Sequence, residues 1–375
     1  MPKSIVVAGI IDSINYGSVV QALATNSVLS EFGDVSFIGY QRGCNTYEHW
    51  RDYVLRDKRY HPVVNVGRVV LQAHKRERGE HVFHDCVREH LKLVDPEPFL
   101  TEGSELDPNA VYCVGSDQTW NYEYNGHRLD PIYCLLNVPD EYRKIALSAS
   151  IGRGKIPDFE AALTYEALKG FDAISVRERS SVSLLDGIGI HGAVSLVDPV
   201  LMCDPDFWAG FGVRKASLPE EYILCYQLNA NPAMVEYANY VSRRLGIPVV
   251  RIEYDWRRAT PVKWQHELLP TVPEWVGMFQ NATQVITDSF HGLCFSILNH
   301  KSMTVFDPPT YSVRLVDALD DFGIAERRVP SDQNAIKRAL WQSETSWQEV
   351  DERLNEERRR ARAFIRKAIG DEDGI

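Results

Sequence analysis

Apolar positions along this 375-residue chain come in short β-branched runs that alternate with longer stretches of helical periodicity. Such alternation is typical of parallel sheets whose strands are joined by crossover helices. The pattern predicts a first open sheet with strands at 4–10, 35–40, 110–114, 144–150, 172–176 and 194–198. It predicts a second, smaller sheet with strands at 222–228, 247–252, 284–287 and 302–306.

The two series of strands indicate two Rossmann-like α/β domains, since a chain of this length exceeds what one core usually supports. We expect an N-terminal domain over 1–205, with a helical insertion at about 45–105, and a C-terminal domain over 206–340. The linker is expected near 203–221, which is rich in Pro, Gly and Asp and has little periodicity.

A separate helix is predicted over 347–369, within a C-terminal segment that spans 341–375. Its apolar positions recur at intervals of three, four or seven residues: Trp347, Val350, Leu354, Ala361, Ile365 and Ala368. The other positions are heavily charged and include a basic cluster of Arg358, Arg359, Arg360, Arg362, Arg366 and Lys367. Because anionic headgroups attract such clusters, a peripheral membrane contact stays open beside packing on the protein.

Composition favours an ordinary water-soluble protein, with 44% hydrophobic and 25% charged residues and a mean hydropathy of −0.27. No apolar run reaches the roughly 18 residues that a membrane span needs, and "SIVVAGII" near the start fits a strand better than a signal peptide. We therefore expect a cytoplasmic location. Seven cysteines without CxxC spacing favour reduced core thiols over zinc, and the net charge of −11 argues against nucleic-acid binding.

Polar and small residues repeatedly follow the predicted strands, in segments 12–24, 115–121, 148–154, 175–181 and 285–298. Each segment alone fits ordinary turn and cap chemistry: Ser18 is expected to cap a helix from Val19, and another helix is expected to begin near Gly292. Ligands of open α/β sheets bind beyond the carboxyl ends of the strands. Five such segments in one chain therefore predict a cleft lined from both domains.

These segments also resemble a known family. "NYGSVVQA", "VGSDQTWN", "SASIG", "SVRERSS", "DPVL" and "TDSFHGLCFSILN", in this order, are similar to motifs of the polysaccharide pyruvyl transferases. The resemblance runs from about residue 4 to about 325. It implies a fold like that of the two-domain GT-B glycosyltransferases, with the C-terminal helix crossing back onto the first domain. It also implies transfer of the enolpyruvyl carbons of phosphoenolpyruvate to a sugar as a ketal.

The resemblance implies roles for particular residues. Arg177 and Arg314 suit the phosphate and carboxylate of phosphoenolpyruvate, and His291 is the candidate general acid. Asp117 or Asp288 would accept the sugar proton, although Asp288 fits a helix N-cap equally well. Further substrate contacts are expected from Asn15, Tyr16, Gly17, Ser18, Gln21, Ser116, Gln118, Trp120, Ser150, Gly152, Ser289 and Gly292.

Within that set, Trp120 fits packing beneath its loop as well as sugar stacking. Segment 115–121 is expected near the acceptor, and the variable region 41–105 is a candidate for acceptor specificity. The implied partners are phosphoenolpyruvate as donor and a saccharide acceptor, free or lipid-linked, without a metal or other cofactor.

Two other function classes remain open. A nucleotide-sugar-dependent GT-B glycosyltransferase would share the architecture and bind a nucleotide in the C-terminal domain, where "IEYDWRR" (252–258) can be read either way. A non-catalytic sugar-binding protein would differ by releasing no phosphate with any acceptor. Binding of phosphoenolpyruvate compared with nucleotide sugars discriminates the first class, and turnover discriminates the second.

Overall fold

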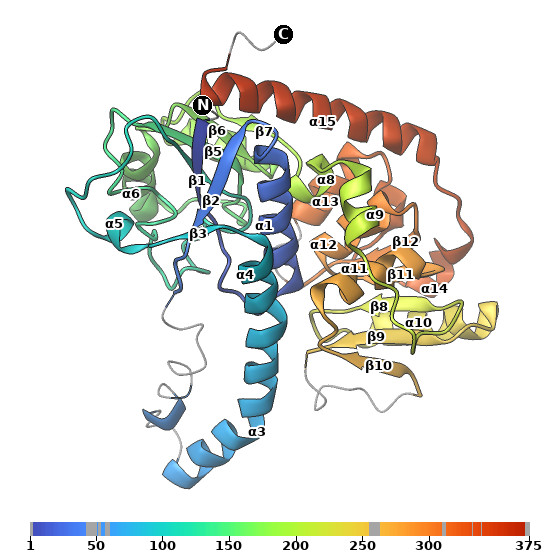
Figure 1. Ribbon diagram of the computed structural model, residues 1–375. Helices are drawn as coiled ribbons and strands as arrows, with labels where there is room; N and C mark the ends of the chain where they lie inside the picture. The colour runs from blue at the N-terminus through green and yellow to red at the C-terminus, as the bar shows by residue number, and fades with distance from the viewer. Residues whose placement is uncertain are drawn as a thin grey trace.

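The computed structural model contains two separate sheets, and all strand pairs in both are parallel (Figure 1). It describes residues 3–42, 51, 54–56, 61–254, 263–309, 313–331, 333–338 and 340–371. The first sheet has the order β3-β2-β1-β4-β5-β6-β7, with β1 (Lys3–Ala8), β2 (Gly33–Ile38), β3 (Leu93–Val94), β4 (Val111–Val114), β5 (Arg143–Ala149), β6 (Ala173–Val176) and β7 (Val194–Ser195). The second has the order β10-β9-β8-β11-β12-β13, with β8 (Ile223–Tyr226), β9 (Val249–Glu253), β10 (Gln265–Leu268), β11 (Gln284–Thr287), β12 (Ser302–Phe306) and β13 (Arg328–Val329).

Helices connect the strands, as parallel pairing requires. In and beside the first sheet they are α1 (Tyr16–Leu29), α3 (Pro62–Glu80), the π-helix η1 (His81–Asp85), α4 (Cys86–His90), α5 (Glu97–Leu100), α6 (Asp158–Leu168), α7 (Arg179–Gly187) and α8 (Pro199–Met202). The others are α9 (Pro205–Phe211), α10 (Pro232–Leu245), α11 (Val272–Asn281), α12 (Phe290–Leu298), α13 (Val313–Asp321), η3 (Ala325–Arg327), α14 (Ala335–Arg338), η4 (Leu340–Gln342) and α15 (Trp347–Ile369).

The predicted α/β fold with two Rossmann-like sheets is confirmed, and each of the ten expected strands overlaps an observed one. The pattern missed β3, β10 and β13, which lie at sheet edges and are only two to four residues long. The segment 203–221, expected to be the linker, contains helix α9. Trp208 of α9 packs on Phe295 of α12 at 4.9 Å between ring centroids, which fixes this segment against the second sheet.

The hydrophobic core is continuous between the two sheets. Alternate residues of a strand face opposite sides of its sheet, so Ile5 and Val7 of β1 point into a core shared with α1, while Val6 and Ala8 point to the other face. The shared core extends through α8, α11 and α12 to one face of the second sheet, at Leu224 and Val285. Helix α1 therefore lies between the sheets, and its amino end can carry residues to the junction of both.

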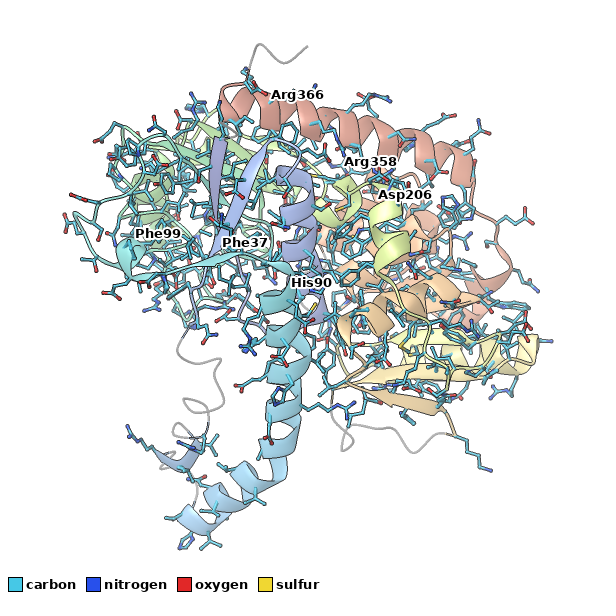
Figure 2. All side chains as sticks on the ribbon, in the orientation of Figure 1. Phe37, His90, Phe99, Asp206, Arg358 and Arg366 are labelled. Atoms are coloured by element: carbon cyan, nitrogen blue, oxygen red, sulfur yellow. The ribbon has the colours of Figure 1, made fainter. Side chains whose placement is uncertain are left out.

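Helix α15 crosses from the second sheet's side to the first (Figure 1). Near its start, Asp351 accepts a hydrogen bond from His300 at 2.9 Å; near its end, the carbonyl oxygen of Ala368 accepts one from Arg143 Nη1 at 2.8 Å. Parts of its basic cluster bind the protein itself: Arg358, labelled in Figure 2, donates to the Leu201 carbonyl, and Arg362 donates to Glu31. These contacts use charges that a membrane contact would otherwise employ.

Candidate functional site

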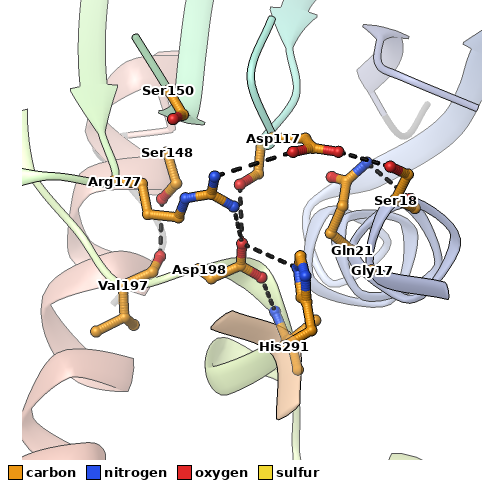
Figure 3. A network of polar contacts seen from close by, with 12 residues as sticks. Gly17, Ser18, Gln21, Asp117, Ser148, Ser150, Arg177, Val197, Asp198 and His291 are labelled. Atoms are coloured by element: carbon orange, nitrogen blue, oxygen red, sulfur yellow. Dashed lines mark hydrogen bonds and ion pairs between the residues drawn. The ribbon is translucent and has the colours of Figure 1, made fainter. Parts of the chain in front are cut away.

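The candidate site lies where loops from both sheets meet the amino ends of α1 and α12. The carboxyl ends of parallel strands face one edge of a sheet, and the loops that follow them are gathered there. Strand β1 leads to Tyr16 at the start of α1, β4 to 115–121, β6 to Arg177 and β11 to 288–291. Figure 3 shows side chains from these segments in one polar network.

Asp198, at the start of α8, is the centre of this network and is 1% exposed. Its Oδ2 accepts hydrogen bonds from Arg177 Nη1 at 2.7 Å and Ser116 Oγ at 3.1 Å, and it lies 3.7 Å from His291 Nε2. Its Oδ1 accepts from the backbone N–H of Val200 at 2.9 Å. Burial alone would raise the pKa of Asp198, but the neighbouring His291 and Arg177 hold it below its ordinary value.

Asp117 occupies a strained position beside α1. Its φ of 76° lies in the left-handed region, which residues other than glycine seldom adopt. Its Oδ2 accepts from Ser18 Oγ at 2.7 Å, and its Oδ1 lies 3.9 Å from Arg177 Nη2. Burial opposes ionisation of Asp117, but Arg177 and His291 lower its pKa overall. This backbone conformation thus places a charged carboxylate between Ser18 of α1 and Arg177.

Arg177 is surrounded by acids rather than left open. Besides Asp198 and Asp117, Glu178 Oε1 lies 3.7 Å from its Nε, and Glu178 is itself held by the hydroxyls of Ser150 and Ser181. Burial alone would lower the pKa of Arg177, but these carboxylates raise it overall. The guanidinium therefore holds three carboxylates in place. The sequence alone predicts only a substrate-binding role for Arg177.

Arg314, on α13, faces the same region from the second domain. The guanidinium carbons of Arg177 and Arg314 lie 4.7 and 5.8 Å from the centroid of the Phe290 ring. Within the described part of the chain, no group accepts a hydrogen bond from Arg314 Nε, although that atom is buried. Burial and repulsion from Arg177 lower the pKa of Arg314. A bound anion would offset both the desolvation of the Arg314 charge and its repulsion from Arg177.

His291 lies in the first turn of α12 and is 7% exposed. Among the described residues, none forms a hydrogen bond with its Nε2. Its ring packs on the first turn of α1, where a Cβ atom built on Gly17 would lie 2.2 Å from His291 Nδ1 (Figure 3). Neither helix has an acidic residue in its first turn. Two positive helix ends and a histidine thus converge, an arrangement that favours an anion.

We predict that Gly17→Ala moves His291 or α1, because a methyl group cannot occupy the space of the imidazole. Forced overpacking costs about 1–3 kcal/mol, so the free energy of unfolding in urea should fall by that amount. Turnover should fall more than tenfold through the displaced histidine. Gly210→Ala on α9 is the matched control, since no described atom beyond its own helix backbone and chain neighbours lies within 4 Å of the added methyl. Equal stability and activity in both variants would contradict the close contact.

Asp288 is not the N-cap of α12, and its carboxylate binds the backbone of a neighbouring loop. Ser289, not Asp288, is the N-cap of α12. The Asp288 carboxylate accepts from the backbone N–H groups of Leu228 and Asn229 at 2.7 and 2.8 Å. Burial raises the pKa of Asp288, although these N–H groups offset part of the shift. Asp288 therefore ties the loop after β8 to the loop that carries His291.

Two aromatic residues expected to contact substrate are buried in packing. Trp120 is 2% exposed and donates its indole N–H to the Tyr133 carbonyl at 2.8 Å, which agrees with packing under the loop rather than sugar stacking. Tyr16 is fully buried, stacks on Trp275 at 5.2 Å and donates to the Pro270 carbonyl. Tyr16 thus joins α1 of the first domain to the second.

Other expected contact residues shape the loops. Asn15 accepts from the Gly17 N–H at 2.8 Å, and Gln21 donates to the Ser18 carbonyl at 3.0 Å. Gly152 has a φ of 68°, and a Cβ there would lie 2.6 Å from the Gln118 carboxamide oxygen. These positions hold the backbone in place around the network.

The expected starts of two helices were wrong by a few residues. Helix α1 begins at Tyr16 with Asn15 as its N-cap, not at Val19 with Ser18 as the cap. Helix α12 begins at Phe290 rather than near Gly292. Ser18 and His291 therefore lie inside the first turns, where their side chains point toward the network instead of closing the helix ends.

Sequence reasoning missed two acids of the network, Asp198 and Glu178. Both lie within motifs that the resemblance had singled out, "DPVL" and "SVRERSS". Asp-Pro at a helix start is a common cap, and Asp198 does cap α8. That ordinary role conceals its second one, which depends on Arg177 and His291 arriving from other elements.

Within the described ranges, no group of three His, Cys, Asp or Glu side chains could hold a metal ion. Six cysteines are buried free thiols, whereas Cys44 lies outside the described residues. None of the described helices is both long and apolar enough to cross a bilayer.

Comparison with known families decides the assignment. The family model for polysaccharide pyruvyl transferase matches residues 15–309. The chain belongs to this family. The match covers every residue of the network from Asn15 to His291, and Arg314 lies just beyond it. Membership of this family implies a saccharide acceptor. No curated protein matches the chain.

Solved structures resemble this pyruvyl transferase in fold. A UDP-forming α,α-trehalose-phosphate synthase from Burkholderia xenovorans is 11% identical, with a TM-score of 0.50, covering 98% of this chain and 99% of that one. A UDP-N-acetylglucosamine 2-epimerase from Rickettsia bellii is 8% identical, with a TM-score of 0.48, covering 99% and 97%. At such identity the likeness concerns the fold alone, and it is that of the GT-B architecture.

Proposed function

We propose that this pyruvyl transferase moves the three carbons of phosphoenolpyruvate to two hydroxyls of a saccharide, forming a pyruvate ketal and releasing phosphate. One observation supports this most. Two buried nitrogen atoms, Arg314 Nε and His291 Nε2, have no hydrogen-bond partner among the described residues, and His291 lies where the amino ends of α1 and α12 meet. A small dianion or trianion matches such a site. Arg314 would bind the donor, while Arg177 positions the acids. No further cofactor is needed, because the donor carries both the transferred group and the leaving phosphate.

The proposed reaction begins with protonation. His291 transfers its Nε2 proton to the methylene carbon of phosphoenolpyruvate, whose double-bond electrons form the new C–H bond and leave an oxocarbenium ion at the central carbon. A sugar hydroxyl adds there and gives its proton to Asp117. The bond from the central carbon to the phosphate oxygen then breaks, and the phosphate leaves with the electron pair and takes the Asp117 proton. The second hydroxyl adds, and its proton restores the His291 imidazolium.

We predict that Asp198→Asn lowers turnover, which depends on the general acid His291, more than it lowers the affinity for phosphoenolpyruvate. Asparagine keeps one acceptor oxygen, which can serve the Val200 N–H at the helix start, but it loses the second acceptor, used by Ser116, and the charge that stabilises an imidazolium 3.7 Å away. Turnover should fall at least tenfold, and the alkaline limb of the pH–activity profile should move to lower pH. Breaking a buried ion pair should also lower the free energy of unfolding by about 3 kcal/mol.

Ser116→Ala is the control for Asp198→Asn, because it removes the 3.1 Å hydrogen bond and leaves the charge in place. Its pH–activity profile should keep the wild-type shape. If Asp198→Asn also keeps that shape, Asp198 does not act through His291.

The direct test of the function is incubation with phosphoenolpyruvate and a panel of glycans, measuring free phosphate and product mass. We expect phosphate release that depends on one class of acceptor, with a product heavier by the pyruvate ketal. Nucleotide sugars in place of phosphoenolpyruvate serve as the control. Transfer from a nucleotide sugar, with none from phosphoenolpyruvate, would replace the proposed function by that of a glycosyltransferase.

A further inference from the structure

A cavity opens at the carboxyl ends of β8 and β9, beside the first turn of α10. Its volume of about 590 Å³ falls within the usual range of small-molecule sites and exceeds what phosphoenolpyruvate alone requires. Gln227, Leu228, Val235, Ile252 and Tyr254 are among the residues of its wall. Ile252 and Tyr254 belong to the segment 252–258, which was left open for a nucleotide, and the other three were not expected to contact substrate. The carboxyl ends of parallel strands are where such sheets bind ligands.

The cavity adjoins the proposed catalytic site. Tyr226 of β8 pairs in register with Thr287 of β11, so the chains leaving both strands emerge side by side. The carboxylate of Asp288 then binds the backbone N–H groups of Leu228 and Asn229, which belong to the cavity wall. Asp288 precedes His291 by three residues. The wall of the cavity and the loop of His291 are therefore one connected structure.

The cavity also faces the first domain. The ring of Tyr254 lies 5.6 Å from that of Tyr16, at the start of α1, and its hydroxyl is 2.9 Å from the Tyr226 hydroxyl. Tyr16 directly precedes Gly17, which contacts His291. The cavity is thus bordered on one side by the helix whose amino end completes the catalytic site.

Charge distinguishes this cavity from the donor site. Its lining includes one guanidinium, Arg251, and one carboxylate, Glu253, and Arg251 Nε lies 3.0 Å from Glu253 Oε1. The same carboxylate oxygen lies 3.2 Å from His266 Nδ1. Both charges are paired and buried, so the lining presents no excess cation for a phosphate. The loop from Gln227 to Pro232 has no glycine to bring its backbone against a pyrophosphate.

The remaining surface suits a neutral, hydroxylated ring. Gln227 is 8% exposed, and no described residue donates a hydrogen bond to its Oε1. Since a buried acceptor without a partner is costly, a ligand hydroxyl would stabilise it. Leu228 and Val235 provide aliphatic surface for the C–H face of a sugar. Trp120, the earlier candidate for sugar stacking, is buried and unavailable.

We propose that this cavity is the acceptor subsite and binds a neutral saccharide unit on the C-terminal domain, an inference that rests on the proposed pyruvyl transfer. The donor is then held by Arg314 and His291 while the acceptor enters from the β8–β9 side. This arrangement differs from the expectation that the acceptor lies along 115–121 of the first domain.

The test fills the cavity with a large side chain and measures saccharide binding and phosphoenolpyruvate binding separately. Val235→Trp on α10 should raise the KM for the saccharide substrate at least tenfold and change the affinity for phosphoenolpyruvate, measured by calorimetry, less than twofold. Ala233→Trp places the same side chain on an exposed position of the same helix, outside the lining, and should behave as wild type. Gln227→Met keeps the length of the side chain and removes the amide, so acceptor affinity should weaken by about 3- to 10-fold, as for one lost hydrogen bond.

Binding is also followed without turnover, by saturation-transfer NMR with a panel of neutral methyl glycosides and disaccharides, and with UMP and UDP as anionic probes. We expect saccharide signals in wild type and Ala233→Trp that disappear in Val235→Trp. Unchanged signals in Val235→Trp, the absence of any saccharide signal in wild type, or UDP binding that Val235→Trp abolishes would each overturn the acceptor assignment.

The two proposals fail differently. Saccharide binding that Val235→Trp abolishes, in a protein that never consumes phosphoenolpyruvate, would remove the proposed function and leave a saccharide cavity. Pyruvyl transfer with an unchanged saccharide KM in Val235→Trp would leave the function and remove the cavity from it.

Discussion

His291→Gln is expected to reduce turnover by about 10²- to 10⁴-fold, the contribution typical of general acid catalysis. Glutamine can donate a hydrogen bond near the position of Nε2, but it cannot transfer a proton to carbon. The fold should survive, because no described residue forms a hydrogen bond with His291 Nε2. Affinity for phosphoenolpyruvate, measured by calorimetry, should change much less than turnover.

His300→Gln is the matched control for this variant. His300 is 46% exposed in its side chain and pairs with Asp351 on α15, away from the network. Its turnover should stay within twofold of wild type. A folded His291→Gln protein that retains more than about a tenth of wild-type turnover would move the acid to another group and leave His291 as an anion ligand.

Arg314→Ala should weaken phosphoenolpyruvate binding by about 10- to 100-fold, as expected for a lost hydrogen bond to a charged group. The structure offers a reason for choosing Arg314 over Arg177. Within the described ranges, Nε and Nη2 of Arg177 lack a hydrogen-bond acceptor, as Nε of Arg314 does, but carboxylates of Glu178 and Asp117 lie 3.7 and 3.9 Å from them and Asp198 binds Nη1 at 2.7 Å. Among the described residues, no carboxylate forms an ion pair with Arg314, so its charge is the one left for a bound anion. Because burial and Arg177 both disfavour the Arg314 charge, removing the guanidinium should cost little stability and leave the midpoint of urea unfolding unchanged or higher.

Calorimetric titration with phosphoenolpyruvate measures this effect, and Arg314→Lys refines it. Lysine restores one charge without the planar pair of donors, so its affinity should lie between those of wild type and Arg314→Ala. Arg214→Ala is the control, since Arg214 is exposed and donates to Asn281 and the Pro219 carbonyl. Wild-type affinity in Arg314→Ala would exclude Arg314 from the donor site.

Much of the fold could be predicted because it depends on local pattern. Buried parallel strands correspond to short β-branched runs in the sequence, and helices correspond to longer segments with helical periodicity. The strands β11 and β12 were therefore predicted with the observed bounds. The edge strands β3 and β13 are two residues long, too short for any period to be visible. Their pairing depends on neighbours already in place.

The candidate site shows the same division. The sequence by itself determined that polar loops follow the strands and that His291, Asp117 and Arg177 belong to them, because the strand pattern places these loops at one edge. Only the tertiary structure decided that Asp198 contacts His291 and that Gly17 leaves room for its ring. Those contacts join residues far apart in the chain, and the core shared by both sheets brings them together. Packing of that core, which no local period encodes, decides which of the polar residues meet.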